Sequence, residues 1–303
     1  MYTNFDNINR DLLKKIENHI QKSGFPFEWK VRDELLKANN LLNSKLQIEH
    51  QSNEVYFKGH YVDQQEQKLR EYDASWYYYK TFNTNNSNNQ SFGVHWHYYF
   101  ECKQSEKYSW IFFTEPPKNY FDIEFSLNFK TSTIISENVF NSFNENNSIY
   151  HYGILPRLGY TYTTYPKGSD LIRNSIYQVI KPCITEFLDY LYDLVEEAKQ
   201  EFFTDIFLFF PVVVFSGLMF EYIYNSQGGE LKPTKHVVLV FKEAFKKGSV
   251  GNTYIIDFVR ADYLRRFLEI QVNEIIKLIK MLSSIDCDIN GIPISHLNYI
   301  LKS

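Results

Sequence analysis

The sequence contains few cysteines. Only three occur among its 303 residues, Cys102, Cys183 and Cys287, and they lie far apart along the chain. Thiols so sparse and scattered do not form a disulfide framework or a cysteine-based zinc cluster, which suits a reducing compartment. The first residues also lack the basic segment followed by an apolar one that is typical of a signal peptide. The sequence therefore predicts a cytoplasmic protein.

An excess of positive charge is absent as well. The formal net charge is −4 and the isoelectric point is near 6.1. A protein that coats nucleic acid through bulk charge would be basic, so a polyanionic partner would need a local site here. Basic residues near the C-terminal end could contact phosphates, but a solvated helix face and loop explain them equally well.

No apolar run is long enough to cross a bilayer. The main uncharged stretch runs from Ile206 to Phe220 and has fifteen residues, whereas a spanning helix needs about 20. Pro211 interrupts it, and three consecutive valines follow. These features predict a fully buried strand, and no membrane partner is expected.

Several familiar motifs are missing. There is no Gly-x-Ser-x-Gly nucleophile elbow, and "QGGE" at 227 to 230 is predicted to be a turn because it lacks the lysine of a phosphate loop. His95 and His97 share a strand face, but no cysteine or further histidine lies at ligand spacing. We expect both histidines to pack and to form hydrogen bonds.

Hydrophobic residues make up 44% of the chain, enough for a large core in one domain or two small ones. Apolar periodicity predicts helices and strands in a mixed order. Helices are expected at 5–22, 27–42, 169–200 and 261–282, and strands at 53–63, 68–82, 93–103, 108–115, 206–220, 235–244 and 252–260. Residues 116–168 show no sustained period and are expected to form an irregular insertion with one short helix. The order predicts an α/β fold with a central mixed β-sheet flanked by helices.

The strand at 93–103 ends in charged residues although aromatic residues precede them. Successive side chains of a strand alternate between its faces, so Glu101 and Lys103 point the same way, roughly 6.6 Å apart, while Cys102 points into the core. The alternation also places Glu71 and Asp73 on one face of the preceding strand, with Tyr72 and Ala74 on the other. If the strands pair, Asp73 and Glu101 approach within the span of one cation.

Two carboxylates in a poorly solvated site repel each other, and a cation relieves the repulsion. Mg²⁺ suits such a site because it prefers oxygen ligands and keeps several waters. Lys103 could then hold the attacking water or stabilise charge on phosphorus. Hydrolysis of a phosphodiester would fit this arrangement, although a Glu-x-Lys pair on a strand is very often only a solvated face.

The arrangement resembles the PD-(D/E)xK (restriction-endonuclease-like) nuclease superfamily, in particular its uncharacterised bacterial members. The matching segments are "GFPFEWKV" at 24–31, "REYDASW" at 70–76 and "FECKQSEKYSWIFF" at 100–113. The resemblance covers residues 24–215, including the insertion at 116–168. Residues 1–23 would form a preceding helix, and residues 216–303 a C-terminal extension of the same domain. The resemblance implies a restriction-endonuclease-like sheet flanked by helices.

By this resemblance, Asp73 and Glu101 would be metal ligands, with the backbone carbonyl of Cys102 as a third. Lys103 would position the attacking water. Glu28 resembles the acidic residue that many members add from the first core helix, although a glutamate at a helix N-terminus is also favourable by itself.

The sequence departs from the family pattern at Tyr72, where the proline that names the motif would stand. Glu71 is expected to be an edge charge or a salt-bridge partner. Gln178 resembles a glutamine that some members direct toward the site, but a surface or capping role is expected, so it is left out of the catalytic set.

The resemblance implies a Mg²⁺-dependent endonuclease, with Mn²⁺ as a substitute, that hydrolyses DNA to 5′-phosphate and 3′-hydroxyl ends in restriction or anti-phage defence. RNA or a small phosphodiester stays open as the substrate. The resemblance is also compatible with a homodimer or with a partner protein of a defence system. The alternative is a catalytically inactive member of the fold that binds nucleic acid or protein.

Overall fold

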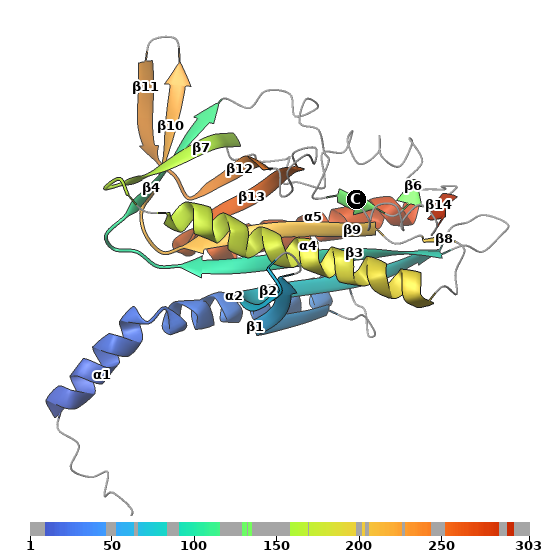
Figure 1. Ribbon diagram of the computed structural model, residues 1–303, viewed down its shortest axis with the longest axis horizontal. Helices are drawn as coiled ribbons and strands as arrows, with labels where there is room; N and C mark the ends of the chain where they lie inside the picture. Colours follow the sequence, from blue (N-terminus) through green and yellow to red (C-terminus); the bar gives the residue numbers. More distant parts are fainter. Residues whose placement is uncertain are drawn as a thin grey trace, which may run out of the picture.

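The structure is a computed structural model. The described residues are 10–46, 53–63, 66–83, 91–115, 129–131, 133–134, 158–168, 170–197, 202–203, 206–225, 228–243, 252–284 and 290–293. They form a mixed α/β fold in which helices flank a large mixed β-sheet (Figure 1). The predicted fold class is confirmed at this level.

The main sheet contains eleven strands of the described residues. Ten of them follow the order β1-β2-β3-β9-β13-β12-β7-β4-β10-β11, and β5 pairs with β9 beside them. The strands are β1 (Asn53–Asp63), β2 (Lys68–Asn83), β3 (Ser91–Lys103), β4 (Ser109–Glu115), β5 (Phe129–Thr131), β7 (Leu158–Tyr165), β9 (Ile206–Phe215), β10 (Met219–Asn225), β11 (Gly228–Pro233), β12 (His236–Glu243) and β13 (Asn252–Arg260). β1, β2 and β3 are antiparallel, whereas β3, β9 and β13 are parallel.

A second, smaller sheet is formed by β6 (Thr133–Ile134), β14 (Asn290–Pro293) and β8 (Phe202–Phe203). The helices are α1 (Arg10–Lys22), α2 (Phe25–Leu46), α4 (Leu171–Glu197) and α5 (Leu264–Ser284), and a short 3-10 turn, η3 (Ala261–Tyr263), precedes α5.

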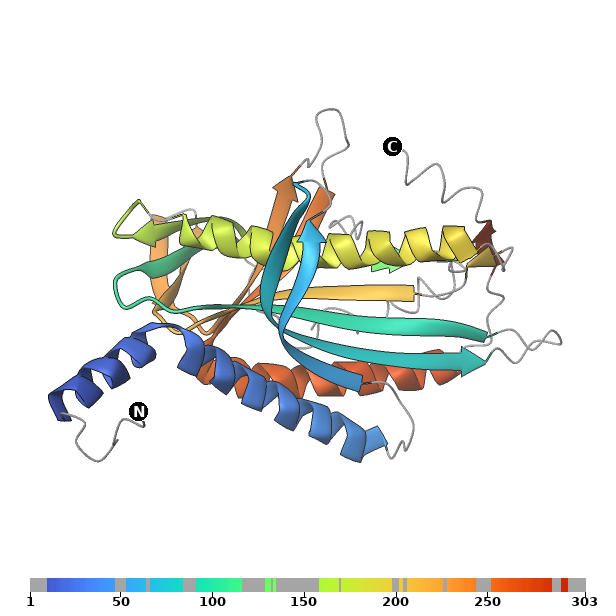
Figure 2. The same cartoon turned by 60° about the horizontal axis from the view of Figure 1, so that its bottom comes forward.

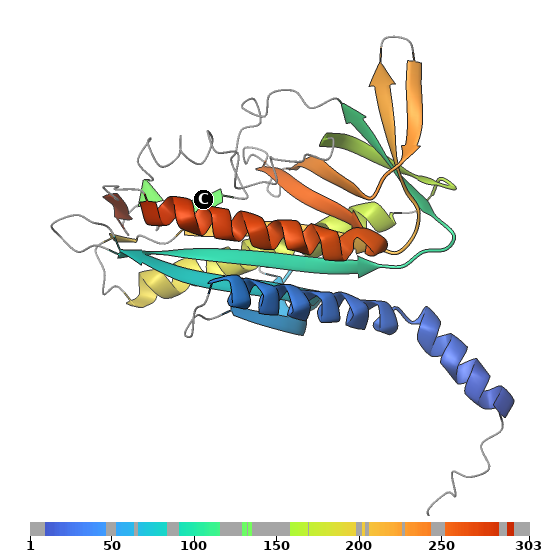
Figure 3. The same cartoon turned by 180° about the vertical axis from the view of Figure 1, so that it is seen from behind.

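The two faces of the long strands are covered by different helices. On one face, α2 and α5 pack side by side over the even-numbered residues of β2 and β3, including Trp76, Tyr98 and Phe100. On the other face, α4 packs Ile176 and Ile180 against β9 and its neighbours. Figure 2 shows the long strands running between α4 and the α2–α5 pair, and Figure 3 shows α2 and α5 from behind. Burial on both faces explains why the strands read as apolar runs.

The pairing of β2 and β3 ends before either strand does. The last paired residues are Ala74 and Phe100. From Ala74 toward its N-terminal end, β2 pairs with β1 as far as Lys68. From Phe100 toward its C-terminal end, β3 pairs with β9 as far as Lys103. The two strands therefore diverge, and Asp73 and Glu101 are the first residues inside the fork that they form.

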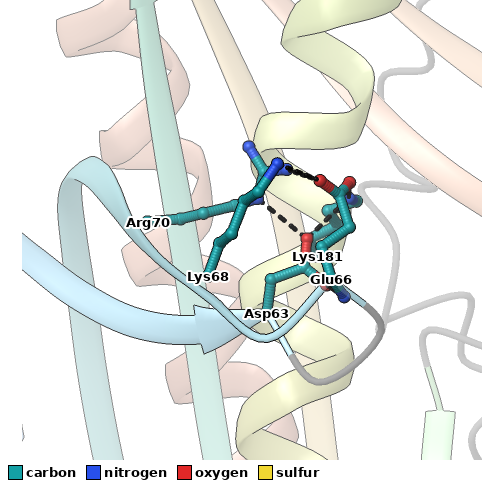
Figure 4. A network of polar contacts seen from close by, with 5 residues as sticks. All are labelled: Asp63, Glu66, Lys68, Arg70 and Lys181. Carbon is teal, nitrogen blue, oxygen red and sulfur yellow. Dashed lines mark hydrogen bonds and ion pairs between the residues drawn. The ribbon is translucent and has the colours of Figure 1, made fainter.

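A network of ion pairs ties the far end of the β1–β2 hairpin to α4. The carboxylate of Asp63, which is 3% exposed, accepts hydrogen bonds from Arg70 Nε at 2.8 Å and Lys181 Nζ at 2.6 Å. Glu66 pairs with the same two cations and with Lys68 (Figure 4). Because Lys181 belongs to α4, this network joins the turn end of the hairpin to that helix.

The uncharged run at 206–220 is not one strand, as the sequence predicts, but two. β9 ends at Phe215, and a turn leads to β10, which lies near the far edge of the same sheet beside β4. Among the described residues, Pro211 has a strand partner on only one side of β9. It pairs with Tyr99 of β3, whereas on the other side it lies between the segment that pairs with β5, residues 206–208, and the segment that pairs with β13, residues 212–215. A proline, which has no N–H to donate, is tolerated where its nitrogen faces an unpaired side of a strand.

Two further expectations are wrong. Residues 158–165 of the predicted irregular insertion form β7, a strand inside the main sheet, and residues 228–230 of the predicted turn belong to β11. Most of 116–157, including the predicted short helix, lies outside the described residues. The long helix is found as α4 and continues through Pro182. None of the helices in the described residues is long and apolar enough to cross a membrane.

Candidate active site

The carboxylate of Asp73 is fixed against β3 at the fork. Its Oδ2 accepts a hydrogen bond of 2.7 Å from the backbone N–H of Cys102. The strand ladder would have supplied a backbone acceptor here, but β2 has already diverged, so a side chain takes its place. The change in strand direction therefore holds Asp73 against the backbone of β3, close enough to Glu101 for its charge to act on that carboxyl.

Glu101 is almost fully buried, with 3% of its surface exposed, and it forms an ion pair with Lys103. Burial raises the pKa of Glu101 to about 7, the negative charge of Asp73 adds to the rise, and the ammonium of Lys103 opposes it. Glu28 contributes to the same rise. Glu101 thus stands in a field of other carboxylates, which is the environment that attracts a cation.

The predicted faces of β3 are confirmed. Cys102 is buried in the core beneath α2 and α5, while Glu101 and Lys103 contact each other on the opposite face. Burial raises the pKa of the Cys102 thiol, so its side chain is an inert part of the core rather than a thiolate.

Lys58, which the sequence analysis missed, lies at the centre of a cluster of carboxylates. Its ammonium is 2.5 Å from Glu28 Oε2, 2.9 Å from Glu71 Oε1 and 3.3 Å from Asp73 Oδ1. Burial disfavours the ammonium, but these three carboxylates outweigh it and raise the pKa of Lys58. Lys58 thereby joins Glu28 at the start of α2 to Glu71 and Asp73 of β2. Glu71 is a salt-bridge partner, as predicted.

Lys58 has a left-handed backbone conformation, with φ of 57°, within β1. It lies between Phe57 and Gly59, whose partners on β2 are Ala74 and Tyr72. A glycine inside a strand pattern marks a bulge or a close approach, so "FKGHY" carried a signal of this irregularity.

The predicted faces of β2 are confirmed for only two of the four residues. Glu71 and Asp73 both contact Lys58, but Tyr72 and Ala74 do not lie on one face. Ala74 is in the core beneath α2 and α5, whereas the Tyr72 ring packs edge-on against Tyr99, with 5.1 Å between centroids. Simple alternation fails because β2 turns away from β3 between these residues.

A groove of about 940 Å³ adjoins the fork. Lys103 and Glu71 line it from the sheet, and the opposite wall comes from α4 and the hairpin. Its cations are Arg70, Lys103, Arg173 and Lys181. Gln178 is partly exposed and lines the same groove as Lys103, which agrees with the expected surface role and also places it near Lys103.

His95 and His97 pack and form hydrogen bonds, as predicted. Both are buried, and the Tyr77 hydroxyl lies 3.0 Å from His95 Nδ1, while His97 Nδ1 is 2.9 Å from a carboxylate oxygen of Glu186 on α4.

The donors at the fork suit a hard divalent cation. Mg²⁺ is usually bound by one or two carboxylates together with waters, and Asp73 and Glu101 provide two. In the part of the chain that the structure describes, no group of three or more His, Cys, Asp or Glu side chains has a metal-binding arrangement. The positive charge near these carboxylates comes from Lys58 and Lys103.

No protein-family model, curated protein or solved structure matches this chain in the comparisons made. A function for the chain therefore has to be inferred from the fork itself.

Proposed function

We propose that this protein is a metal-dependent nuclease that hydrolyses phosphodiester bonds of DNA. The main support is the convergence of Glu28, Asp73, Glu101 and Lys103 from α2, β2 and β3, with Glu101 buried and its pKa raised to about 7. Burying a carboxylate near two others costs free energy, and natural proteins retain such costs mainly at functional sites.

The residues at the fork would have separate roles in catalysis. Asp73 and Glu101 would hold Mg²⁺ or Mn²⁺, together with the backbone carbonyl of Cys102, and Glu28 would add negative charge from α2. A bound divalent ion would lower the pKa of a ligated water and stabilise charge on the phosphate. Lys103, in contact with Glu101, would orient the attacking water.

The topology is compatible with the restriction-endonuclease-like core implied by the sequence. A helix, three antiparallel strands, a helix and a strand parallel to the third occur as α2, β1–β3, α4 and β9. Arg173 and the ion-paired Arg70, Lys103 and Lys181 line the groove, together with the carboxylates of Glu66 and Glu71, and these cations could contact the phosphates of a substrate. A role in restriction or anti-phage defence extends the same proposal.

One observation favours the alternative, an inactive module that binds nucleic acid or protein. Lys58 supplies to Glu28, Glu71 and Asp73 the positive charge that a metal ion would otherwise bring. A fork neutralised in this way would keep its shape without a metal and without catalysis.

Cleavage assays separate the two functions. The purified protein is incubated with linear and circular DNA, with and without Mg²⁺ or Mn²⁺, beside Asp73→Asn and Glu101→Gln. Asparagine keeps an oxygen for the Cys102 N–H, so folding should be preserved while a negative charge is lost. We expect metal-dependent cleavage that falls by at least about 100-fold in both variants.

The matched control is Glu269→Gln, which removes a partly exposed carboxylate of α5 that pairs with Arg265 and Arg266 rather than with a fork residue. It should cleave like the unmodified protein. Equal cleavage by all variants, or none by folded protein under any metal condition, would refute the nuclease, and the second result combined with DNA binding would support the inactive module.

A further inference from the structure

A second cavity, of about 440 Å³, lies between the β1–β3 sheet and α4. Tyr61 lines both this cavity and the groove beside the fork, so the two spaces adjoin. A cavity of this size accommodates a small planar molecule rather than a single ion. None of the roles proposed above uses it.

The walls of the cavity are aromatic. The Tyr72 and Tyr99 rings meet edge-on, the His95 ring stacks on Phe207 with 4.2 Å between centroids, and Tyr190 of α4 adds a further ring. Flat π surfaces on several sides favour a planar heteroaromatic ligand, because each base of a nucleic acid has a π face that stacks on such rings.

Two polar atoms in the wall have no hydrogen-bond partner among the described residues. They are His97 Nε2, in a side chain that is 6% exposed, and Glu186 Oε2. Since His97 Nδ1 faces the other oxygen of Glu186, the ring proton belongs on Nδ1, and Nε2 then accepts hydrogen bonds while the ring is neutral. Buried polar groups without partners are rare in native proteins and indicate an unseen ligand or water.

We propose that this cavity binds one nucleobase, whose ring stacks between the aromatic walls and whose N–H groups donate to His97 and Glu186. The source that the adjoining groove favours is an unstacked base of the DNA strand held there, which rests on the proposed nuclease function. A free nucleotide would offer the same base chemistry, and the experiment separates the two sources.

Base binding is measured without metal, in EDTA, so that cleavage plays no part. A short single-stranded oligonucleotide with one 2-aminopurine and the free 2-aminopurine riboside serve as probes, because stacking quenches their fluorescence. We expect saturable quenching by the unmodified protein. Glu186→Ala and Tyr190→Ala, on the partly exposed face of α4, should weaken it by about tenfold or more.

Glu269→Ala is the matched control on α5 and should bind like the unmodified protein. Tighter binding of the oligonucleotide than of the riboside assigns the base to a strand, and equal binding assigns it to a free nucleoside or nucleotide, whose base is the part that the cavity recognises. Absence of quenching with both probes, or unchanged binding in both α4 variants when circular dichroism shows them folded, overturns the proposal.

The two proposals fail separately in these assays. Quenching without metal-dependent cleavage would leave the base site in place and refute the nuclease. Cleavage that depends on Asp73, with quenching that does not depend on Glu186 or Tyr190, would refute the base site alone.

Discussion

Replacement of Glu101 by glutamine should stabilise the protein at alkaline pH and leave its stability unchanged at acidic pH. Glutamine has nearly the same shape and keeps an oxygen for Lys103, but it cannot ionise. The expectation follows from the burial of Glu101, which raises its pKa from the ordinary 4.5 to about 7 in the folded protein.

The sign follows from proton linkage. Between pH 4.5 and about 7 the folded state holds the Glu101 proton more tightly than the unfolded state, so stability is greatest below 4.5 and is lost as the pH rises through 7. At about 1.4 kcal/mol per pH unit, this interval corresponds to a loss of about 3 kcal/mol. Glu101→Gln should escape the loss, so the two free energies of unfolding should coincide at pH 4.5 and differ by up to about 3 kcal/mol at pH 8.

Urea denaturation in EDTA, from pH 4.5 to 8.5, measures both free energies under the same conditions. Mg²⁺ added at pH 8 should stabilise the unmodified protein more than the variant, because a ligand that binds the folded state alone raises its stability. A variant that is less stable at pH 8, or a difference that does not change with pH, would refute the account of Glu101.

Three further predictions concern the β1–β2 hairpin. Without metal, Lys58→Met should lower the free energy of unfolding by about 2 kcal/mol, because it leaves carboxylates unpaired. The same variant should bind Mg²⁺ more tightly in calorimetry. Weaker Mg²⁺ binding would show that Lys58 does not compete with the ion. Asp63→Asn should lower the free energy of unfolding by about 2 kcal/mol at pH 7. Hydrogen bonds from Lys181 and other donors outweigh burial and lower the pKa of Asp63 to about 2. The stability that Asp63 contributes is therefore present above pH 3.8 and disappears toward pH 2. Urea titrations over that range test this, and a cost independent of pH contradicts it. Gly59→Ala should destabilise the folded protein by about 1–3 kcal/mol, since the new Cβ would lie 2.0 Å from Tyr72 Cζ. The clash is not the cause if Gly59→Ala lowers the melting temperature equally when Tyr72→Ala is already present.

Strand alternation proved reliable where the strand has regular partners. β3 is paired on both sides up to Phe100 and still beside β9 at Lys103, and its predicted faces hold for Glu101 and Cys102. The same rule failed for Tyr72, since β2 changes direction at the fork. Local alternation contains no information about where a neighbouring strand leaves.

The run at 206–220 shows a second limit. Its composition correctly indicated burial for residues 207–215, but Leu218 in the turn after Phe215 is exposed, and this turn sends β10 to a different part of the sheet. β7 was missed although "LGYTYTTY" is rich in tyrosine and threonine, which favour strands. It carries no run of apolar residues, and its partners β4 and β12 are distant in sequence.

The sequence by itself determined the mixed order of helices and strands, the buried character of the strands, and the side of β3 on which Glu101 and Lys103 lie, because these depend on local periodicity. Tertiary structure alone decided that Lys58 contacts Glu28, Glu71 and Asp73, that Asp73 bonds to the Cys102 N–H, and that Gln178 faces the groove. These contacts join segments that only the fork between β2 and β3 brings together, so no spacing along the chain could encode them.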